Sequence, residues 1–257
     1  MSGSARGTQF TVLGPADSVT EQRLGAFYRY PDGLDRCWVR GNMIASVDGG
    51  ATADGKSGAL GGAGDRTVFD TMRESADVIL VGASTVRVEN YSGAQLSPAA
   101  RSARQQRGQA EVPPIAVITG SGRLDHDAKV FTRTEVPPLI LTSTDAVADT
   151  GDRLGGVAEV IDASGTDPGS VDAAAALRIL AGRGLLRVLA EGGPGVLGLL
   201  TAADLLDELC LTVAPVLVGG SAPRIVGGPG AVHTAMTRTH VLGDGDGYLY
   251  CRYVRTR

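Results

Sequence analysis

The sequence contains few cysteines and histidines, and neither kind of residue is grouped. Cys37, Cys210 and Cys251 lie far apart, and no CxxC pair is present. An odd, scattered set of thiols argues against a disulfide framework or a zinc site and favours buried thiols in a reducing compartment. The three histidines also lack the HxE and PCxxC patterns of the zinc deaminases. We therefore expect no metal site and a cytoplasmic protein.

The chain also lacks long apolar runs and an excess of positive charge. No segment approaches the length of a membrane span, and the first residues lack the charged-then-apolar order of a secretory signal. The net charge of -4 leaves no electrostatic footprint for nucleic acid or acidic membranes. With 257 residues, 43% of them hydrophobic, the chain is long enough to bury a sizeable core. We expect a soluble protein with a small-molecule partner.

Three common nucleotide and hydrolase motifs are missing as well. The first predicted strand ends in SVDGG rather than in the GxGxxG of dinucleotide-binding folds, and no Walker motif occurs. The nucleophile elbow GxSxG is absent, although Gly120-Ser121-Gly122 superficially resembles part of it. These absences leave chemistry that a bound cofactor carries, with the protein supplying orientation and a few polar groups.

The chain does contain glycine turns directly after apolar segments. In RVLAEGGPGVLGLL (187–200), a predicted strand reaches Glu191, passes through Gly192 and Gly193, and enters an apolar helix. Bare backbone N–H groups at such a turn, together with the helix dipole, suit a phosphate or pyrophosphate. An ordinary strand-to-helix turn is the alternative. Similar turns follow strands at Gly82 and Gly120, so the three predict one nucleotide groove at the carboxyl edge of a sheet.

The order of apolar segments predicts strands that alternate with helices and end in consecutive, antiparallel strands. This order indicates one mixed, mostly parallel sheet with helices on both faces. We expect a single domain over residues 18–257, after a flexible leader over residues 1–17. The predicted strands are 37–47, 77–81, 115–119, 139–142, 157–161 at an edge, 187–190, 209–218 and 247–254; the predicted helices include 18–30, 65–75 begun by Asp65, and 172–183.

The long segment 90–113 is polar, and we interpret it as a mobile loop with some helix. Its arginines, Arg101, Arg104 and Arg107, then form a solvated surface.

Two positions suggest ligand contacts from their chemistry. Glu191 places a carboxylate beside a buried glycine turn, where it must be paired or functional. Arg123 follows Thr119 and Ser121, and a guanidinium with two hydroxyls suits the 2′-phosphate of a ribose. A surface charge in a turn is the equal alternative for Arg123.

Together, the ordered segments NMIASVDG (42–49), ILVGASTVRVE (79–89), VLAEGGPGVL (188–197) and DELCLTVAPVLVGG (207–220) resemble the pyrimidine reductase of riboflavin biosynthesis. The resemblance covers about Trp38 to Val254 and is closest to the stand-alone actinobacterial type, without the zinc deaminase of bifunctional members. It implies a dihydrofolate-reductase-like, three-layer αβα fold. It also implies NADPH as cofactor, hydride transfer to a ribosylamino-pyrimidine of the 5-amino-6-(5-phosphoribosylamino)uracil type, and a homodimer.

The resemblance also implies roles for individual residues. The cofactor set comprises the two glycine turns, a nicotinamide contact on the first strand and the 2′-phosphate residues: Ile44, Gly82, Ser84, Thr85, Val86, Thr119, Ser121, Arg123, Gly192, Gly193, Gly195, Val196 and Leu197. The substrate set is polar: Asn42, Ser46, Asp48, Ser57, Arg73, Glu89 and Glu191. Each substrate residue has a structural alternative: a turn for Asp48, a helix-surface charge for Arg73 and a loop hydroxyl for Ser57.

The chain departs from the family on the substrate side. Bacterial members usually have a lysine at the position of Asn42 and an aspartate at that of Glu89. A phosphate-contacting arginine is missing from residues 92–96. These departures keep two alternatives open, namely dihydrofolate as the substrate on the same fold, or a non-catalytic NADP-binding protein.

Overall fold

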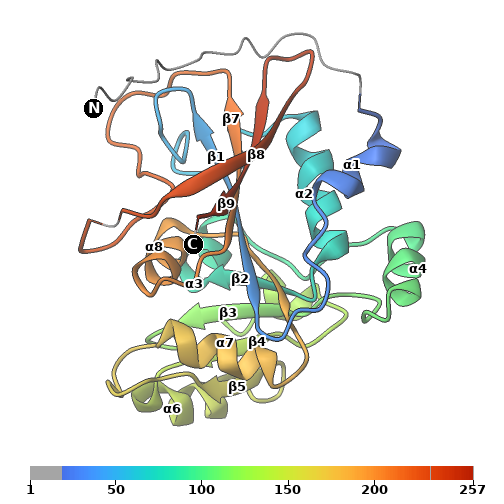
Figure 1. Cartoon of the computed structure of the whole chain (residues 1–257). Coiled ribbons are helices and arrows are strands. Elements are labelled where there is room, and N and C mark those ends of the chain that lie inside the picture. Colours follow the sequence, from blue (N-terminus) through green and yellow to red (C-terminus); the bar gives the residue numbers. More distant parts are fainter. Residues whose placement is uncertain (1–18, 232, 257) are drawn as a thin grey trace, which may run out of the picture.

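The computed structural model describes residues 19–231 and 233–256, and a nine-stranded sheet runs through them (Figure 1). Its strand order is β5-β4-β3-β2-β6-β1-β7-β9-β8. The strands are β1 (Trp38–Ser46), β2 (Val78–Gly82), β3 (Ile115–Thr119), β4 (Leu139–Thr142), β5 (Glu159–Asp162), β6 (Arg187–Ala190), β7 (Glu208–Ala214), β8 (Met236–Gly243) and β9 (Leu249–Arg255).

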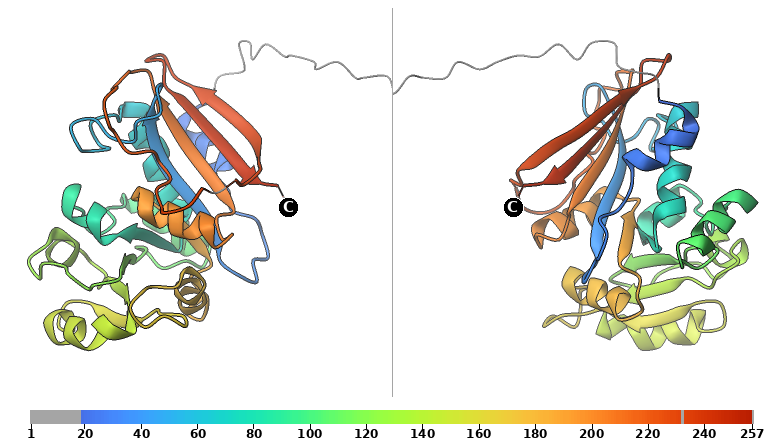
Figure 2. Two further views of the ribbon diagram at one scale, coloured as in Figure 1. Left: turned by 90° about the vertical axis from the view of Figure 1, so that its left-hand side faces the viewer. Right: turned by 45° about the vertical axis from the view of Figure 1, so that its right-hand side comes forward.

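Neighbouring strands from β5 to β7 pair in parallel, whereas β9 pairs antiparallel with β7 and with β8. All side chains of β2 and β3 are buried, as expected for strands covered on both faces of a parallel sheet. The β8–β9 hairpin extends the sheet at one end (Figure 2). The predicted mixed, mostly parallel sheet is confirmed, and β5 lies at an edge as expected.

Helices cover both faces of the sheet and enclose two apolar clusters. The first cluster includes Val68 and Met72 of α2, and the second includes Leu177 of α7 and Leu197 of α8. The helices are α1 (Glu21–Phe27), α2 (Ala63–Ser75), α3 (Ala83–Val88), α4 (Pro98–Gln106), α5 (Lys129–Thr132), α6 (Thr144–Leu154), α7 (Ala173–Ala181) and α8 (Pro194–Ala202). The three-layer αβα arrangement of the dihydrofolate-reductase-like class is therefore confirmed.

Several elements differ from the sequence-based prediction. The strand predicted for 209–218 ends at Ala214, because Pro215 has no N–H with which to continue the ladder. Helix α6 was not predicted, since its Thr, Asp and Gly residues have low helix propensity; it is stabilised by packing against β5. Strand β8 was not predicted either, because its side chains are mostly exposed or half-buried and show no alternation.

The predicted N-terminal helix is shorter than expected. Helix α1 begins at Glu21 and ends at Phe27, inside the predicted range 18–30, and Leu24 and Tyr28 are buried. The predicted leader, residues 1–17, and the first residue of the predicted helix, Ser18, lie outside the described residues.

The segment 90–113 contains α4, and Arg104 in that helix corrects the expectation of a solvated surface. The side chain of Arg104 is fully buried. Its guanidinium donates to the main-chain oxygens of Glu74, Ala76 and Ala110 at 2.9, 2.5 and 2.8 Å. Two of those acceptors lie at the end of α2, where carbonyl groups have no partner within the helix. Arg104 therefore caps α2, and burial lowers its pKa to about 10.

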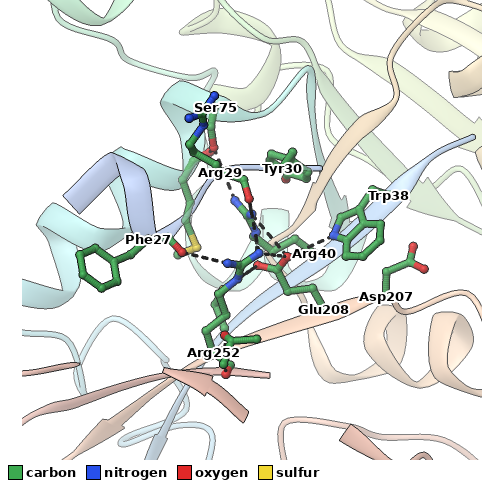
Figure 3. Close-up of polar contacts among 12 residues, drawn as sticks. Phe27, Arg29, Tyr30, Trp38, Arg40, Ser75, Asp207, Glu208 and Arg252 are labelled. Carbon is green, nitrogen blue, oxygen red and sulfur yellow. Dashed lines mark hydrogen bonds and ion pairs between the residues drawn. The ribbon is translucent and has the colours of Figure 1, made fainter. Parts of the chain in front are cut away.

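A buried ion cluster joins β1, β7 and β9 (Figure 3). Glu208 accepts from Arg40 at 2.5 Å and from Arg252 at 2.8 Å, and Arg40 and Glu208 are fully buried. Arg252 also donates to the main-chain oxygen of Phe27, at 3.0 Å. Burial opposes the charge on Glu208, but the two arginines outweigh it and lower the pKa of its carboxyl group to about 2. The cluster therefore ties the end of α1 to three strands.

Candidate active site

A cavity of about 520 Å³ opens at the carboxyl ends of β1 and β6 and beside the first turns of α2 and α3. Nine of the predicted site residues line it: Asn42, Ile44, Ser57, Arg73, Ser84, Thr85, Glu89, Glu191 and Gly193. They come from segments that are far apart in the sequence. The carboxyl edge of a parallel sheet is where such folds bind ligands, so this cavity is the candidate active site.

Glu191 and Arg73 form a close ion pair within the cavity. Arg73 donates from Nε and Nη2 to the two carboxylate oxygens of Glu191, both at 2.8 Å. Arg73 also donates to the hydroxyl of Tyr91 at 2.7 Å and lies 4.2 Å from the ring centre of Phe69. Burial disfavours the charge on Arg73, but Glu191 raises its pKa overall. Arg73 is therefore not the helix-surface charge of the structural alternative, and Glu191 is paired.

Ser57 and Glu89 form a second polar contact at the cavity. The carboxylate of Glu89 accepts from both the main-chain N–H and the hydroxyl of Ser57, at 2.8 and 2.9 Å. Glu89 follows the last residue of α3, and Ser57 lies in the loop between β1 and α2. The pair thus anchors the loop that forms one wall of the cavity.

The two glycine turns after β2 and β6 lie against each other. The N–H of Gly82 donates to the oxygen of Gly192 at 2.8 Å. Gly192 has a φ of 87°, which favours glycine, and the Gly192–Gly193 peptide bond is cis. A Cβ on Gly193 would lie 2.7 Å from the hydroxyl oxygen of Thr85, so only glycine leaves this main chain open to the cavity. The predicted phosphate-binding turns are thus adjacent in space.

Not every residue of these turns is free to contact a ligand. The side chains of Val86, Val196 and Leu197 are buried in the core. The N–H groups of Val196 and Leu197 donate to the oxygen of Gly193, at 2.9 and 3.3 Å. These three residues therefore do not face the cavity. Gly195, by contrast, is exposed, and a side chain at this position would meet open space.

The predicted 2′-phosphate residues lie outside the cavity lining, next to α3. Thr119 is buried, and its hydroxyl accepts from the N–H of Gly122 at 3.1 Å. Ser121 and Arg123 are exposed. The guanidinium of Arg87 donates to the main-chain oxygen of Arg123 at 2.9 Å, which brings a second arginine to this turn. The sequence analysis does not identify Arg87, because it assigns roles only to the residues of the phosphate-binding turn before it.

Ser46 and Asp48 are not brought into the cavity. The carboxylate of Asp48 accepts from the hydroxyl of Ser46 at 2.5 Å and from the N–H groups of Val218 and Gly219 at 3.2 and 2.7 Å. These hydrogen bonds lower the pKa of Asp48 to about 2, with the Ser46 contact contributing most. The prediction that they belong to the substrate set is therefore not supported by their position, and the turn-shaping alternative describes Asp48 better.

Several residues that line the cavity were not predicted as site residues, among them Asp65, Arg66, Phe69 and Tyr91. Asp65 was expected to begin the helix, but α2 starts two residues earlier, after Gly62, and Asp65 lies in its first turn. The helical spacing of Arg66, Phe69 and Arg73 places them on neighbouring parts of one helix face, and this was the signal that sequence reading missed. No group of three potential metal ligands occurs among the described residues.

Comparison with known proteins identifies the family. The RibD C-terminal domain model matches residues 37–250. This chain belongs to that family. The sequence is 30% identical to the 2,5-diamino-6-ribosylamino-4(3H)-pyrimidinone 5′-phosphate reductase of Methanothermobacter thermautotrophicus, over 81% of this chain and 95% of that protein. The predicted resemblance is confirmed.

Two further similarities show the extent of the match. The riboflavin biosynthesis protein RibD of Bacillus amyloliquefaciens is 31% identical over 75% of this chain, but the matched region is only 50% of that protein. The chain thus spans about half of the length of this relative. The crystal structure of a pyrimidine reductase-like protein from Corynebacterium diphtheriae is similar with a TM-score of 0.77 and 27% identity, covering 86% of this chain and 92% of that one.

No helix in the described part of the chain is long and apolar enough to cross a membrane.

Proposed function

We propose that this protein is an NADPH-dependent reductase of a ribosylamino-pyrimidine 5′-phosphate in riboflavin biosynthesis. One observation carries the proposal. Residues that the resemblance assigned separately to the substrate and to the cofactor phosphates, such as Glu191, Arg73 and Gly193, line a single cavity. The names of the family relatives support the same substrate class.

The residues at the glycine turns fit a nicotinamide dinucleotide. Gly193, Ser84 and Thr85 line the cavity together at the start of α8, and Gly195 in the first turn of that helix is exposed. A glycine turn at a helix N-terminus suits a pyrophosphate. When bound there, the cofactor supplies a hydride. The chain's own part is to hold the substrate: the Arg73–Glu191 pair and Asn42 present fixed donors and acceptors to a pyrimidine ring and its sugar hydroxyls. Arg66, exposed at the cavity, supplies positive charge for the substrate phosphate.

The test is oxidation of NADPH by the purified protein, followed by nicotinamide absorbance. Its arms are the diamino-pyrimidinone 5′-phosphate, the corresponding aminouracil and dihydrofolate. Turnover of either pyrimidine, with dihydrofolate silent, supports the proposal and shows which pyrimidine is preferred. Turnover of dihydrofolate alone would reassign the pocket to pterins. Tight NADPH binding without any turnover would leave a non-catalytic NADP-binding protein.

We further propose that the preference for NADPH over NADH comes from Arg123 and Arg87. Arg123 lies in an exposed turn, and the exposed side chain of Arg87 in α3 donates to its main-chain oxygen. A charged hydrogen bond to a phosphate contributes about 1.5–3 kcal/mol. Arg123→Gln is expected to raise the KM for NADPH about tenfold and leave that for NADH unchanged. Arg133→Gln, which removes an exposed arginine from the turn after α5, is the control. Equal effects on both cofactors would contradict the assignment.

We also propose a cytoplasmic homodimer. Three free, buried cysteines are compatible with a reducing compartment. The outer edge of β8 has no strand partner among the described residues, and such edges favour pairing with another chain. Light scattering coupled to gel filtration measures the mass directly, and a monomer at micromolar concentration would reject the dimer.

A further inference from the structure

The proposed reduction adds a proton as well as a hydride to the substrate, and none of the roles assigned so far supplies that proton. Three carboxyl groups line the cavity among the described residues: Asp65, Glu89 and Glu191. Glu191 is held by the guanidinium of Arg73, and Glu89 by the N–H and hydroxyl of Ser57. Both carboxylates are thereby fixed as hydrogen-bond acceptors. Asp65 is the remaining carboxyl group of the cavity lining that could supply the proton.

The side chain of Asp65 reaches from the first turn of α2 to the sheet beside the cavity. Its carboxyl group forms a hydrogen bond with the buried hydroxyl of Thr212 on β7. Thr212 is paired in register with Ile44 on β1, and Ile44 lines the cavity. Neighbouring strands lie about 4.8 Å apart. Thr212 therefore lies about one strand spacing from Ile44 in the cavity wall, and Asp65 itself lines the cavity.

The first turn of α2 is held against the β8–β9 hairpin. A Cβ on Gly64 would overlap the hydroxyl of Tyr250 and the carboxylate of Asp244, so the helix backbone approaches these two groups directly. Tyr250 donates its hydroxyl to Asp244 at 2.5 Å, and the hydroxyl of Tyr248 donates to the oxygen of Leu60 at 3.0 Å. This packing fixes the position from which Asp65 enters the cavity.

The surroundings of Asp65 favour its protonated form. Burial raises the pKa of its carboxyl group, and the hydrogen bond from Thr212 and the charge of Arg66 only partly offset this. The groups that face it are Arg66 on its own helix, Thr212 on β7 and Tyr250 on β9, whose hydroxyl donates to Asp244. A carboxyl group in such a setting carries a proton at a higher pH than in water.

We propose that the carboxyl group of Asp65 is the proton donor of the reduction. As the hydride adds to the carbon of the substrate C=N bond, the π electron pair of that bond moves to nitrogen. The nitrogen takes the Asp65 proton and becomes an amine N–H. The Asp65 carboxylate then regains a proton from water. This step rests on the proposed function, which supplies the nicotinamide hydride and the ribosylamino substrate. Opening of the ribose ring breaks the bond between C1′ and the ring oxygen, moves the amine proton to that oxygen and leaves the C1′=N bond that is reduced.

The test is the pH dependence of kcat in wild type, Asp65→Asn and Asp65→Glu. A general acid must be protonated, so wild-type kcat falls as pH rises through the pKa of Asp65. Asp65→Asn is expected to lower kcat about a hundredfold or more and to abolish its fall with rising pH, while cofactor affinity stays unchanged. In Asp65→Glu, kcat still falls with rising pH, but the midpoint of the fall is displaced. Asp145→Asn, which removes the first-turn acid of α6 far from the cavity, is the matched control.

A second measurement does not depend on turnover. The infrared C=O band of the protonated Asp65 carboxyl, identified by its loss in Asp65→Asn, is expected to persist above the ordinary titration range of aspartate. A band that titrates in the ordinary range overturns the proposal, as does an Asp65→Asn variant with the wild-type pH profile and no greater loss than Asp145→Asn. If wild type reduces no pyrimidine, the proposed function fails separately, and the infrared band alone decides the protonation of Asp65.

Discussion

The Arg73–Glu191 pair shows how a charged residue can be buried and still be placed for binding. The side chains of Arg73 and Glu191 are only 12% and 3% exposed. Each charge therefore relies on the other, with Tyr91 as a further partner of the guanidinium. A pair of this kind costs free energy to desolvate, and removing one partner costs more than removing both.

Arg73→Met is expected to leave Glu191 as an uncompensated buried charge. The free energy of unfolding should fall by about 3–5 kcal/mol, measured by urea denaturation. The double variant Arg73→Met with Glu191→Gln should recover most of this stability but no turnover, because the polar contacts to the substrate are gone. A double variant as unstable as the single one would show that packing, not charge, causes the loss.

Arg104 in α4 holds the end of α2, a helix that is not adjacent to α4 in the sequence. Three buried or part-buried hydrogen bonds join its guanidinium in α4 to main-chain oxygens at the end of α2 and after α4. Because α2 carries Asp65 and Arg73, the position of that helix matters for the cavity. The arginine-rich segment 90–113 thus fastens the helix on which two residues of the site lie.

Arg104→Met should destabilise the protein by about 3 kcal/mol or more, since each buried carbonyl left without a partner costs about 1–3 kcal/mol. The control is Arg101→Met in the same helix. Its side chain makes a partly exposed ion pair with Glu135, and such pairs contribute about 0–1 kcal/mol. Thermal unfolding of both variants measures the difference. Similar losses for the two would refute the capping role of Arg104.

The elements that could be predicted from the sequence are those with local signals. The sequence predicts the buried strands β2 and β3 and the glycine turns after β2 and β6, because continuous apolar runs and the glycines that follow them are visible within a few residues. Contacts over long distances were not. Arg73 and Glu191 are 118 positions apart, and the approach of Asp65 to Thr212 depends on how α2 packs on the sheet. Pairings of this kind follow from tertiary structure alone.

The cluster of Arg40, Glu208 and Arg252 makes the free energy of unfolding of the whole protein depend on pH in the acidic range. The pKa of Glu208 is about 2 in the folded protein, below its ordinary value of 4.5. Its contribution is therefore complete above about pH 4.5 and is lost as the pH falls through 2. Because the cluster joins β1, β7 and β9, its loss affects the sheet rather than one loop.

Urea denaturation at a series of pH values from 6 to about 2 tests this dependence. Wild type should lose stability steeply below pH 4.5. Glu208→Gln should be less stable by about 3–5 kcal/mol at neutral pH, since two arginines lose their partner, and should show a shallower acid slope. Asp149→Asn, which removes an exposed carboxylate from a surface ion pair, serves as the control. Equal acid slopes in Glu208→Gln and wild type would contradict the assignment.

The position of β1 in the sheet has a consequence for synthesis of the protein. β1 leaves the ribosome before its two neighbours in the sheet, β6 and β7, which are translated long after it. At about 5–20 residues per second, the interval between Ser46 and Arg187 is on the order of ten seconds. During that time the nascent chain carries an apolar strand with both edges open, a state that favours aggregation. Protection by chaperones is thus needed most before the central strand finds its late partners.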